Sequence, residues 1–156
     1  MIRPTVPDDT PVLVHLAGET GFFKPHEVEA LKEVLDDYHE FNQQHGHRCV
    51  TREEHGKPIG FAYYAPAAMT DRTWYLYWIA VSKTIQARGV GSGLLKHVED
   101  EIRKAGGRVL FIETSSLPLY EPTRKFYLKN GYDQDAVLHD YYADGDSMVV
   151  FRKKLS

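Results

Sequence analysis

The sequence predicts an α/β fold in which a mostly antiparallel sheet contains one central parallel crossover. Residues 73–114 read as strand, amphipathic helix and buried strand, an order that joins two parallel strands. The segments on either side read as short strands joined by tight turns, as antiparallel neighbours are. We therefore expect the element order β-α-α-β-β-β-α-β-α-β-β in a single domain over residues 1–156.

The bulk composition is that of an ordinary globular chain. Of the 156 residues, 42 % are hydrophobic and 26 % are charged. A net charge of −3 gives no electrostatic case for nucleic-acid binding, and no apolar run is long enough to span a membrane. The first residues lack the apolar stretch of a secretory signal, and the single cysteine excludes an internal disulfide framework. We expect a cytoplasmic protein.

The first part of the chain predicts a strand followed by two helices. Residues 2–6 can form the strand. Polar residues that can cap a helix precede Pro11, and proline suits the first helical position, so a helix should run from there to about Thr20. Pro25 opens the second helix, whose apolar residues recur at helical spacing. These apolar residues are Val28, Leu31, Val34, Leu35 and Tyr38.

Three strands and the long helix of the crossover follow. Residues 47–54 and 58–67 read as a hairpin, and residues 73–82 are dense in the aromatic and β-branched side chains that favour strands. Residues 82–89 bridge to a helix with a strong apolar stripe, ended by a pair of glycines. The stripe consists of Val90, Leu94, Leu95, Val98, Ile102 and Ala105. Residues 108–114 contain a continuous apolar run, the mark of a strand covered on both faces.

The last part of the chain predicts a short helix and a hairpin. Pro122 lies near the start of the helix and Gly131 at its end. Strands over residues 133–142 and 147–154 meet at the Asp-Gly turn of residues 144–145.

A glycine-rich segment, QARGVGSG at residues 86–93, lies where the bridge becomes the long helix. The start of a helix presents unpaired N–H groups and partial positive charge, and it therefore binds anions such as phosphate. Each glycine costs a helix about 1 kcal/mol relative to alanine, and it lets a bulky anion approach the backbone. Arg88 adds charge. The glycine spacing indicates a phosphate-binding loop. Alternatively, the glycines bind no ligand and only give a flexible helix start that packs closely on the sheet.

Two common phosphate ligands do not fit this loop. A Walker A loop needs lysine and then serine or threonine after its last glycine, whereas Leu94 and Leu95 stand there. A dinucleotide fingerprint would need glycine in place of Leu94. Glu113 does stand at the end of the next strand, where that motif has an acid that binds the ribose. The bridge is also too long for that tight turn, and no second crossover follows.

The same residues resemble the GNAT family of N-acetyltransferases. The spacing Q-x-x-G-x-G over residues 86–91 is similar to the family signature Q/R-x-x-G-x-G/A, between a strand and an amphipathic helix as the family requires. Downstream, FYLKNGY at residues 126–132 resembles the second family motif, F/L-Y-x-K-x-G-F/Y. Two motifs in the family's order identify the chain as a member, and they leave the substrate open.

The resemblance implies a site for acetyl-CoA. The pantetheine arm would lie between the splayed strands 73–82 and 108–114, and the acetyl group would pass directly to a primary amine. Residues 79–81 would contact pantetheine and the acyl group, and residues 86–92 would cradle the pyrophosphate. A backbone N–H near Val81 would stabilise the oxyanion, an effect worth about 3 kcal/mol. The implied cofactor-binding residues are Ile79, Ala80, Val81, Gln86, Ala87, Arg88, Gly89, Val90, Gly91, Ser92, Tyr120 and Tyr127.

Tyr127 matches the family position that protonates the departing CoA thiolate, with Phe126 expected to anchor the helix in the core. The alternative is a Tyr127 that is merely packed on the helix face. Many members carry Asn and Ala where this chain has Tyr120 and Thr123, within a Y-x-P-T-R variant of the motif. An asparagine role is therefore not available, and we expect Tyr120 to contact the cofactor.

The general base is less defined than the acid. Tyr75 and Tyr77 stand where relatives place Glu or His, and tyrosine, with a pKa near 10, is a poor base at neutral pH. Glu113 is the best carboxylate candidate, acting through water. Alternatively, Glu113 is a strand-end acid bonded to Thr114, Ser115 or a nearby hydroxyl.

Other chemistries were weighed against these motifs. His39, His45, His47 and Cys49 lack the paired spacing of a zinc site, so we expect no metal. Nothing local activates Cys49 as a nucleophile. The aromatic residues within 74–78 fit a half-buried strand better than base stacking. A non-catalytic acyl-CoA-binding or regulatory module remains the alternative to an enzyme.

The acceptor is the least determined part of the site. In this family it is held near residues 22–25 and 140–146, and it can be a small metabolite or a peptide or protein amine. Asp140, Asp144 and Asp146 are candidates to attract a cationic amine, or they are simply solvated. The sequence determines neither the acyl chain length nor the oligomeric state; homodimers are common in the family, but no interface is visible.

Overall fold

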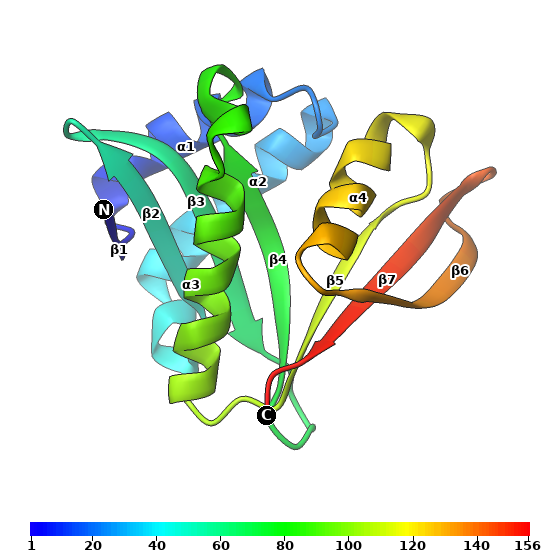
Figure 1. The fold of residues 1–156 in the computed structure, drawn as a ribbon. Helices are drawn as coiled ribbons and strands as arrows, with labels where there is room; N and C mark the ends of the chain where they lie inside the picture. Colours follow the sequence, from blue (N-terminus) through cyan, green and yellow to red (C-terminus); the bar gives the residue numbers. More distant parts are fainter. The chain divides into compact units, whose positions relative to one another are not determined.

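The computed structural model describes the side chains of residues 1–85 and 88–156. Within this described part, seven strands form one mixed sheet in the order β1-β2-β3-β4-β5-β7-β6 (Figure 1). β4 and β5 pair in parallel, Thr73 with Val109 through Leu76 with Ile112. The pairs β1–β2, β2–β3, β5–β7 and β6–β7 are antiparallel. The predicted α/β fold, with one parallel crossover in a mostly antiparallel sheet, is confirmed.

The element boundaries agree with the sequence patterns to within a few residues. The strands are β1 (Ile2–Pro4), β2 (Arg48–Glu54), β3 (Lys57–Pro66), β4 (Thr73–Val81), β5 (Val109–Ser115), β6 (Asp133–Ala143) and β7 (Asp146–Lys154). The helices are α1 (Thr10–Glu19), α2 (Pro25–Glu40), α3 (Val90–Lys104) and α4 (Glu121–Lys129), with short 3-10 turns η1 (Pro7–Asp9), η2 (Asn42–His45), η3 (Lys83–Arg88) and η4 (Pro118–Tyr120). Ala105, expected at the end of the apolar stripe, lies beyond α3 and is exposed. Among the described residues, no helix is both long and apolar enough to cross a membrane.

The chain divides into two compact units, each with its own packing. The N-terminal unit comprises residues 1–66 and 78–98, and the C-terminal unit comprises residues 67–77 and 99–156.

In the N-terminal unit, α1 and α2 cover one face of β2 and β3, and α3 begins on the other face (Figure 1). The buried cluster under α1 and α2 consists of Leu13, Leu16, Ala17, Leu31, Leu35, Tyr38, Cys49, Phe61, Tyr63 and Ala80. On the other face, Gly60 lets α3 and the end of β4 lie close to β3. A Cβ at this position would lie 2.9 Å from Leu94 Cδ1 and 3.1 Å from the Ala80 carbonyl oxygen. A glycine in β3 therefore positions the start of α3 beside the end of β4.

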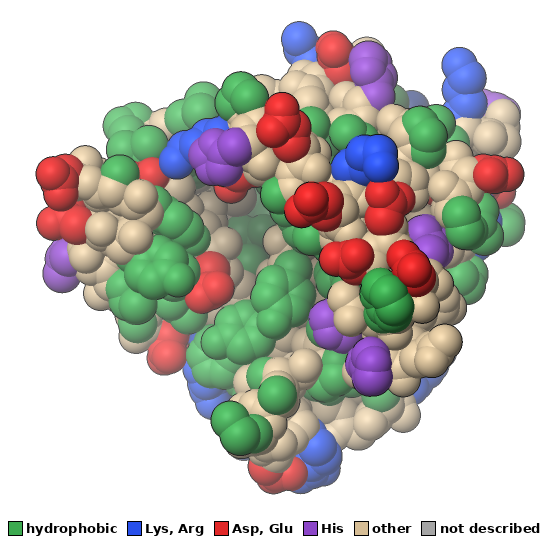
Figure 2. Space-filling view, turned by 180° about the vertical axis from the view of Figure 1, so that it is seen from behind, with side chains coloured by type: hydrophobic (Ala, Val, Ile, Leu, Met, Phe, Trp, Pro, Cys, Tyr) green, Lys and Arg blue, Asp and Glu red, His purple; other side chains and the backbone are tan. Residues whose placement is uncertain are grey.

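The outer surface of α2 is polar. Figure 2 shows acidic and histidine side chains gathered over this side of the N-terminal unit. On α2 the exposed acids include Glu29, Glu33, Asp36 and Asp37. This helix is thus amphipathic, with its apolar stripe on the sheet and its charges in water.

In the C-terminal unit, α4 packs on one face of β5 and β7 (Figure 1). Leu110, Ile112 and Phe151 are almost fully buried on this face. Successive strand residues alternate, and on β5 Phe111 is only half-buried while Glu113 is exposed. The expectation that this strand is covered on both faces therefore holds at the start of β5, where Val109 and Leu110 are both buried, and fails further along, where Phe111 and Glu113 lie on the face opposite α4.

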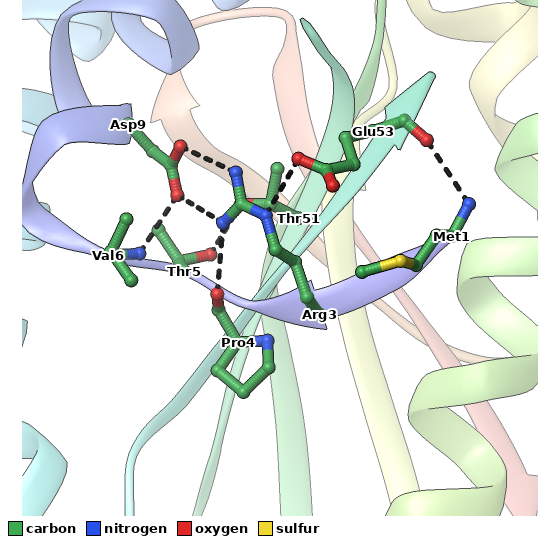
Figure 3. A network of polar contacts seen from close by, with 8 residues as sticks. All are labelled: Met1, Arg3, Pro4, Thr5, Val6, Asp9, Thr51 and Glu53. Atoms are coloured by element: carbon green, nitrogen blue, oxygen red, sulfur yellow. Dashed lines mark hydrogen bonds and ion pairs between the residues drawn. The ribbon is translucent and has the colours of Figure 1, made fainter. Parts of the chain in front are cut away.

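An ionic cluster fastens β1 to the residues that precede α1 (Figure 3). The Arg3 guanidinium donates to the two carboxylate oxygens of Asp9 at 2.7 and 2.9 Å, and its Nε donates to Glu53 at 2.9 Å. Asp9 also accepts the Val6 N–H at 2.9 Å. The Arg3 hydrogen bonds hold the pKa of Asp9 below its usual value.

Replacing Asp9 by asparagine should lower the free energy of unfolding by about 2 kcal/mol at neutral pH, because the half-buried Arg3 loses one of its two carboxylate partners. The folded-state pKa of Asp9 is depressed, so its contribution is present above the unfolded pKa of about 3.9 and is lost as pH falls through the folded value. Urea unfolding at pH 7 and pH 3 should show the difference between wild type and Asp9→Asn shrinking in acid. The exposed Asp8→Asn is the control; a difference that does not depend on pH would contradict this assignment.

Candidate functional site

The glycine segment begins α3 in the N-terminal unit, as predicted. Gly89 has a φ of +75°, a left-handed conformation that side chains with a Cβ rarely adopt. A Cβ built on Gly89 would have no heavy atom of the described residues within 4 Å, so the space above the helix start is open. Helical hydrogen bonding starts here, since the Gly93 N–H donates to the Gly89 carbonyl at 3.1 Å. The first N–H groups of a helix have no partner within it, which makes this start suitable for an anion.

The end of β4 lies next to this helix start. Ala80 and Val81 are buried and Ile79 is half-buried. The Ser82 N–H donates to the Ile59 carbonyl at 2.7 Å, which fastens the end of β4 to β3. The N-terminal unit therefore brings together the predicted residues 79–81 and the described members of the glycine loop.

The remaining predicted residues of the loop differ in their surroundings. Gln86 and Ala87 lie outside the described residues. Val90 is buried, so any contact that it makes with an anion must come from its backbone. Arg88 donates through Nη2 to both carboxylate oxygens of Glu54 at 2.9 Å, and these bonds lower the pKa of Glu54. This partner could not be predicted from local patterns, because Glu54 lies 34 residues before Arg88, at the end of another strand.

Tyr127 is the main anchor of α4 in the C-terminal unit. Its ring is 4 % exposed and packs against the rings of Phe126, Tyr132 and Phe151, with centroid distances of 5.5, 6.0 and 5.5 Å. Phe126 is half-buried, so the expectation that it anchors the helix is wrong: the side of α4 that faces Phe151 carries Tyr127. Burial raises the pKa of the Tyr127 hydroxyl, which therefore stays protonated. No hydrogen-bond partner of this hydroxyl is found among the described residues.

A buried ionic network explains the rest of the second motif. Tyr132 donates its hydroxyl to Glu99 Oε2 at 2.7 Å, and Lys153 Nζ donates to Glu99 Oε1 and to the Asn130 carbonyl, each at 3.0 Å. Glu99 is only 5 % exposed. Glu99 was not among the residues predicted for the site, although its place on the apolar stripe of α3, one helical turn after Leu95, indicates a buried acid.

The Y-x-P-T-R segment fastens β5 to α4. Tyr120 is 9 % exposed at the end of η4. Arg124 Nη1 donates to the carbonyls of Ser115 and Leu117 at 2.7 and 2.9 Å. The arginine of this variant thus holds the connection that sets the start of the helix carrying Tyr127.

Replacing Arg124 by alanine should lower the free energy of unfolding by about 2 kcal/mol, since two carbonyls lose charge-assisted hydrogen bonds. The variant Arg124→Lys should keep part of the free energy of unfolding that Arg124→Ala loses. The neighbouring Lys125→Ala, which removes an exposed ion pair with Glu121, should change stability by less than about 0.5 kcal/mol. Urea unfolding measures all three variants. Equal stabilities for Arg124→Ala and Lys125→Ala would show that the two bonds contribute nothing.

Glu113 lies exposed at the end of β5, and partial desolvation of its carboxyl raises its pKa. Ser115 does not bond to it, because the Ser115 hydroxyl donates to Asp146. Among the described residues no hydrogen-bond partner of Glu113 is found. The interpretation of Glu113 as a bonded strand-end acid is therefore not supported, whereas an available carboxylate is present.

Two of the three hairpin acids have structural roles. Asp146 is 3 % exposed and accepts the Ser115 hydroxyl. Asp140 adopts a φ of +57° and accepts the Gly145 N–H at 2.8 Å. Asp146 is therefore not a surface acid that can attract an amine, and Asp140 stabilises the turn.

Of the residues that could bind a metal or act as a nucleophile, His47 has an ordinary partner, whereas the buried Nε2 of His39 has no hydrogen-bond partner among the described residues. His47 Nδ1 lies 2.6 Å from the Tyr63 hydroxyl. Cys49 is buried, which raises the pKa of its thiol to about 12 and keeps it protonated. Within residues 1–85 and 88–156, no group of three or more His, Cys, Asp or Glu side chains is arranged to hold a metal ion.

The strand order, the parallel β4–β5 pair and the glycine start of α3 define the acetyltransferase class of α/β fold. The model of the Acetyltransferase (GNAT) family matches residues 14–132. The chain therefore belongs to the GNAT acetyltransferase family.

Individual relatives agree with this assignment. The chain is 33 % identical over 66 residues to the uncharacterized N-acetyltransferase YsnE of Bacillus subtilis, a match that covers 42 % of this chain and only 44 % of that relative. A crystal structure assigned to the GNAT family from Desulfovibrio desulfuricans is 35 % identical, with a TM-score of 0.96 over 100 % of this chain and 99 % of the other. An aminoglycoside 6′-N-acetyltransferase in complex with coenzyme A shares the fold, with 18 % identity and a TM-score of 0.78 over 100 % and 97 % of the two chains.

Proposed function

We propose that the chain is an acyltransferase that moves an acetyl group from acetyl-CoA to a primary amine, and that residues 1–156 act as one domain. The observation that carries the proposal is the left-handed Gly89 at the start of α3, whose Cβ position no described residue crowds, in a member of the GNAT family. The same proposal includes a cytoplasmic location and a homodimer.

The residues at the helix start suit the pyrophosphate of the donor. Backbone N–H groups of residues 89–92 would bind its oxygens, and the open space at Gly89 leaves room for them. Arg88 would share its charge between Glu54 and the phosphates. Residues 79–81 would align the pantetheine arm, and the thioester supplies the activated acetyl group. That an acetyltransferase of the same fold was solved with coenzyme A supports this choice of donor.

Starting from the neutral amine, the reaction needs two proton transfers and no covalent enzyme intermediate. The amine nitrogen forms a bond to the thioester carbon, and the carbon–sulfur bond breaks. Glu113 takes the proton that the amine loses, through water, and Tyr127 gives a proton to the departing thiolate. A backbone N–H near Val81 stabilises the oxyanion, by about 3 kcal/mol.

Ligand-dependent melting tests the choice of donor. CoA and acetyl-CoA should raise the melting temperature, since a ligand at 100 times its Kd stabilises by about 2.7 kcal/mol. NAD should not. Comparing acetyl-CoA with longer acyl-CoAs then reports the preferred acyl chain. A protein that NAD stabilises and CoA does not would refute the proposal.

A further inference from the structure

One face of the C-terminal unit carries a partly exposed set of aromatic rings, in which Tyr75 and Phe111 are half-buried and Tyr77 is exposed. Tyr75 and Tyr77 on β4 stack with centroids 5.7 Å apart and an interplanar angle of 27°. Phe111 on β5 lies beside Tyr75 at 5.8 Å, and the two residues are partners in the parallel register. Tyr77 is 52 % exposed. Because α4 packs on the face that carries Ile112 and Phe151, these rings line the opposite face of the unit.

A carboxylate stands on the same face. Glu113 follows Phe111 by two positions and therefore shares its side of the sheet. Burial raises the pKa of both Tyr75 and Tyr77, and the negative charge of Glu113 raises both further. This effect of its charge indicates that the Glu113 carboxyl lies near both phenols. On β7, Val150 is the register partner of Glu113, and Arg152 is the partner of Phe111. The face thus has an apolar floor, an acid at one end and a cation further along.

This combination has a definite chemical preference. Aromatic faces attract cations through their quadrupole, and a nearby carboxylate adds to that attraction. The stacked rings also offer a flat surface on which a second ring can pack. A polycation would need more than one acid and would be repelled by Arg152. A single ammonium on a flat apolar body matches the aromatic rings and Glu113, and it can lie at the Glu113 end, away from Arg152.

We infer that the platform formed by Tyr75, Tyr77, Phe111 and Glu113 binds the acceptor, and that the acceptor is a primary amine carried by an aromatic group. The ring packs on the tyrosines and its ammonium donates to Glu113. The inference rests on the proposed function and adds the substrate class to it. It also gives Glu113 a position next to the proton that the amine must lose before it attacks.

Equilibrium binding tests the platform with three matched probes, measured by calorimetry in the presence of CoA. 2-Phenylethylamine carries both ring and charge, n-butylamine lacks the ring, and 2-phenylethanol lacks the charge. We expect 2-phenylethylamine to bind about tenfold more tightly than either of the others, since each lacks one of the two attractions. Equal affinities for the three probes would overturn the inference.

Variants on the platform should weaken binding selectively. Glu113→Gln and Tyr77→Leu should each weaken 2-phenylethylamine about tenfold, whereas Tyr77→Phe, which keeps the ring, should bind nearly as the wild type does. The controls are Glu121→Gln, an exposed acid on α4, and Phe41→Leu, a ring that is 54 % exposed in the N-terminal unit. Melting without ligand verifies that each variant is folded. Platform variants that bind like the controls would show that the amine lies elsewhere.

Turnover, amine binding and stabilisation by CoA, measured together, distinguish a failure of this inference from a failure of the proposed function. Turnover of acetyl-CoA with aliphatic amines but not with 2-phenylethylamine would refute the aromatic substrate class and leave the acyltransferase in place. Binding of 2-phenylethylamine that depends on Glu113, in a protein that CoA does not stabilise, would refute the acyltransferase and leave the amine site.

Discussion

Replacing Tyr127 by phenylalanine is expected to lower turnover by about 10²–10⁴-fold, with CoA binding and stability nearly unchanged. The ring keeps its contacts with Tyr132 and Phe151, so the core of the C-terminal unit survives. The hydroxyl that is lost has no hydrogen-bond partner among the described residues, so its removal costs little stability. Turnover should fall because the Tyr127 hydroxyl, which we propose protonates the departing CoA thiolate, is removed. Steady-state rates at saturating acetyl-CoA, taken where chemistry limits the rate, measure the effect.

Tyr132→Phe is the matched control for this change. It also removes one buried hydroxyl, but that hydroxyl donates to Glu99. We expect a loss of about 1–3 kcal/mol in the free energy of unfolding and a nearly normal rate for each folded molecule. Unaltered turnover in Tyr127→Phe would make Tyr127 a purely structural anchor of α4.

Replacing Gly91 by tryptophan should abolish stabilisation by CoA while the protein remains folded. Gly91 lies in the first turn of α3, where a bulky side chain would cover the N–H groups proposed to hold the pyrophosphate. Gly89 is a poorer site for this test, because its φ of +75° strains any residue with a Cβ. CoA-dependent melting and calorimetry measure the loss.

Gly93→Ala serves as the control for the loop. A Cβ at Gly93 meets no heavy atom of the described residues within 4 Å, and alanine should stabilise the helix by about 1 kcal/mol without loss of CoA binding. A folded Gly91→Trp protein that CoA still stabilises would refute the position assigned to the pyrophosphate.

Most of the fold followed from local patterns in the sequence. The stripe from Val90 to Ile102 predicted α3 because each of its members repeats at helical spacing, and all of them are buried in the structure. The order strand, helix, strand predicted the parallel pairing of β4 with β5, because a crossover of that length permits little else. These features depend on neighbours in the chain, and a single sequence reports such features well.

The errors concern packing between distant residues. Phe126 and Tyr127 are adjacent aromatic residues, and only the direction of α4 against Phe151 decides which of them is buried. The pairing of Arg88 with Glu54 and the network around Glu99 join segments that are far apart in sequence. The tyrosine platform was visible as alternation on a strand, but its exposure depends on which face of the C-terminal unit α4 covers. The divergence of β4 from β5 toward their carboxyl ends stays a prediction.

The most direct test of the central claim is a product balance with acetyl-CoA and a panel of primary amines that includes 2-phenylethylamine. Free thiol and N-acetylated amine are measured together, the first by a thiol reagent and the second by mass spectrometry. An acyltransferase that works by direct attack releases thiol and acetylated amine in equal amounts, and without an amine it releases thiol no faster than the buffer. If CoA binds but no amine raises thiol release above that background, the chain is a CoA-binding module and the proposed activity is wrong.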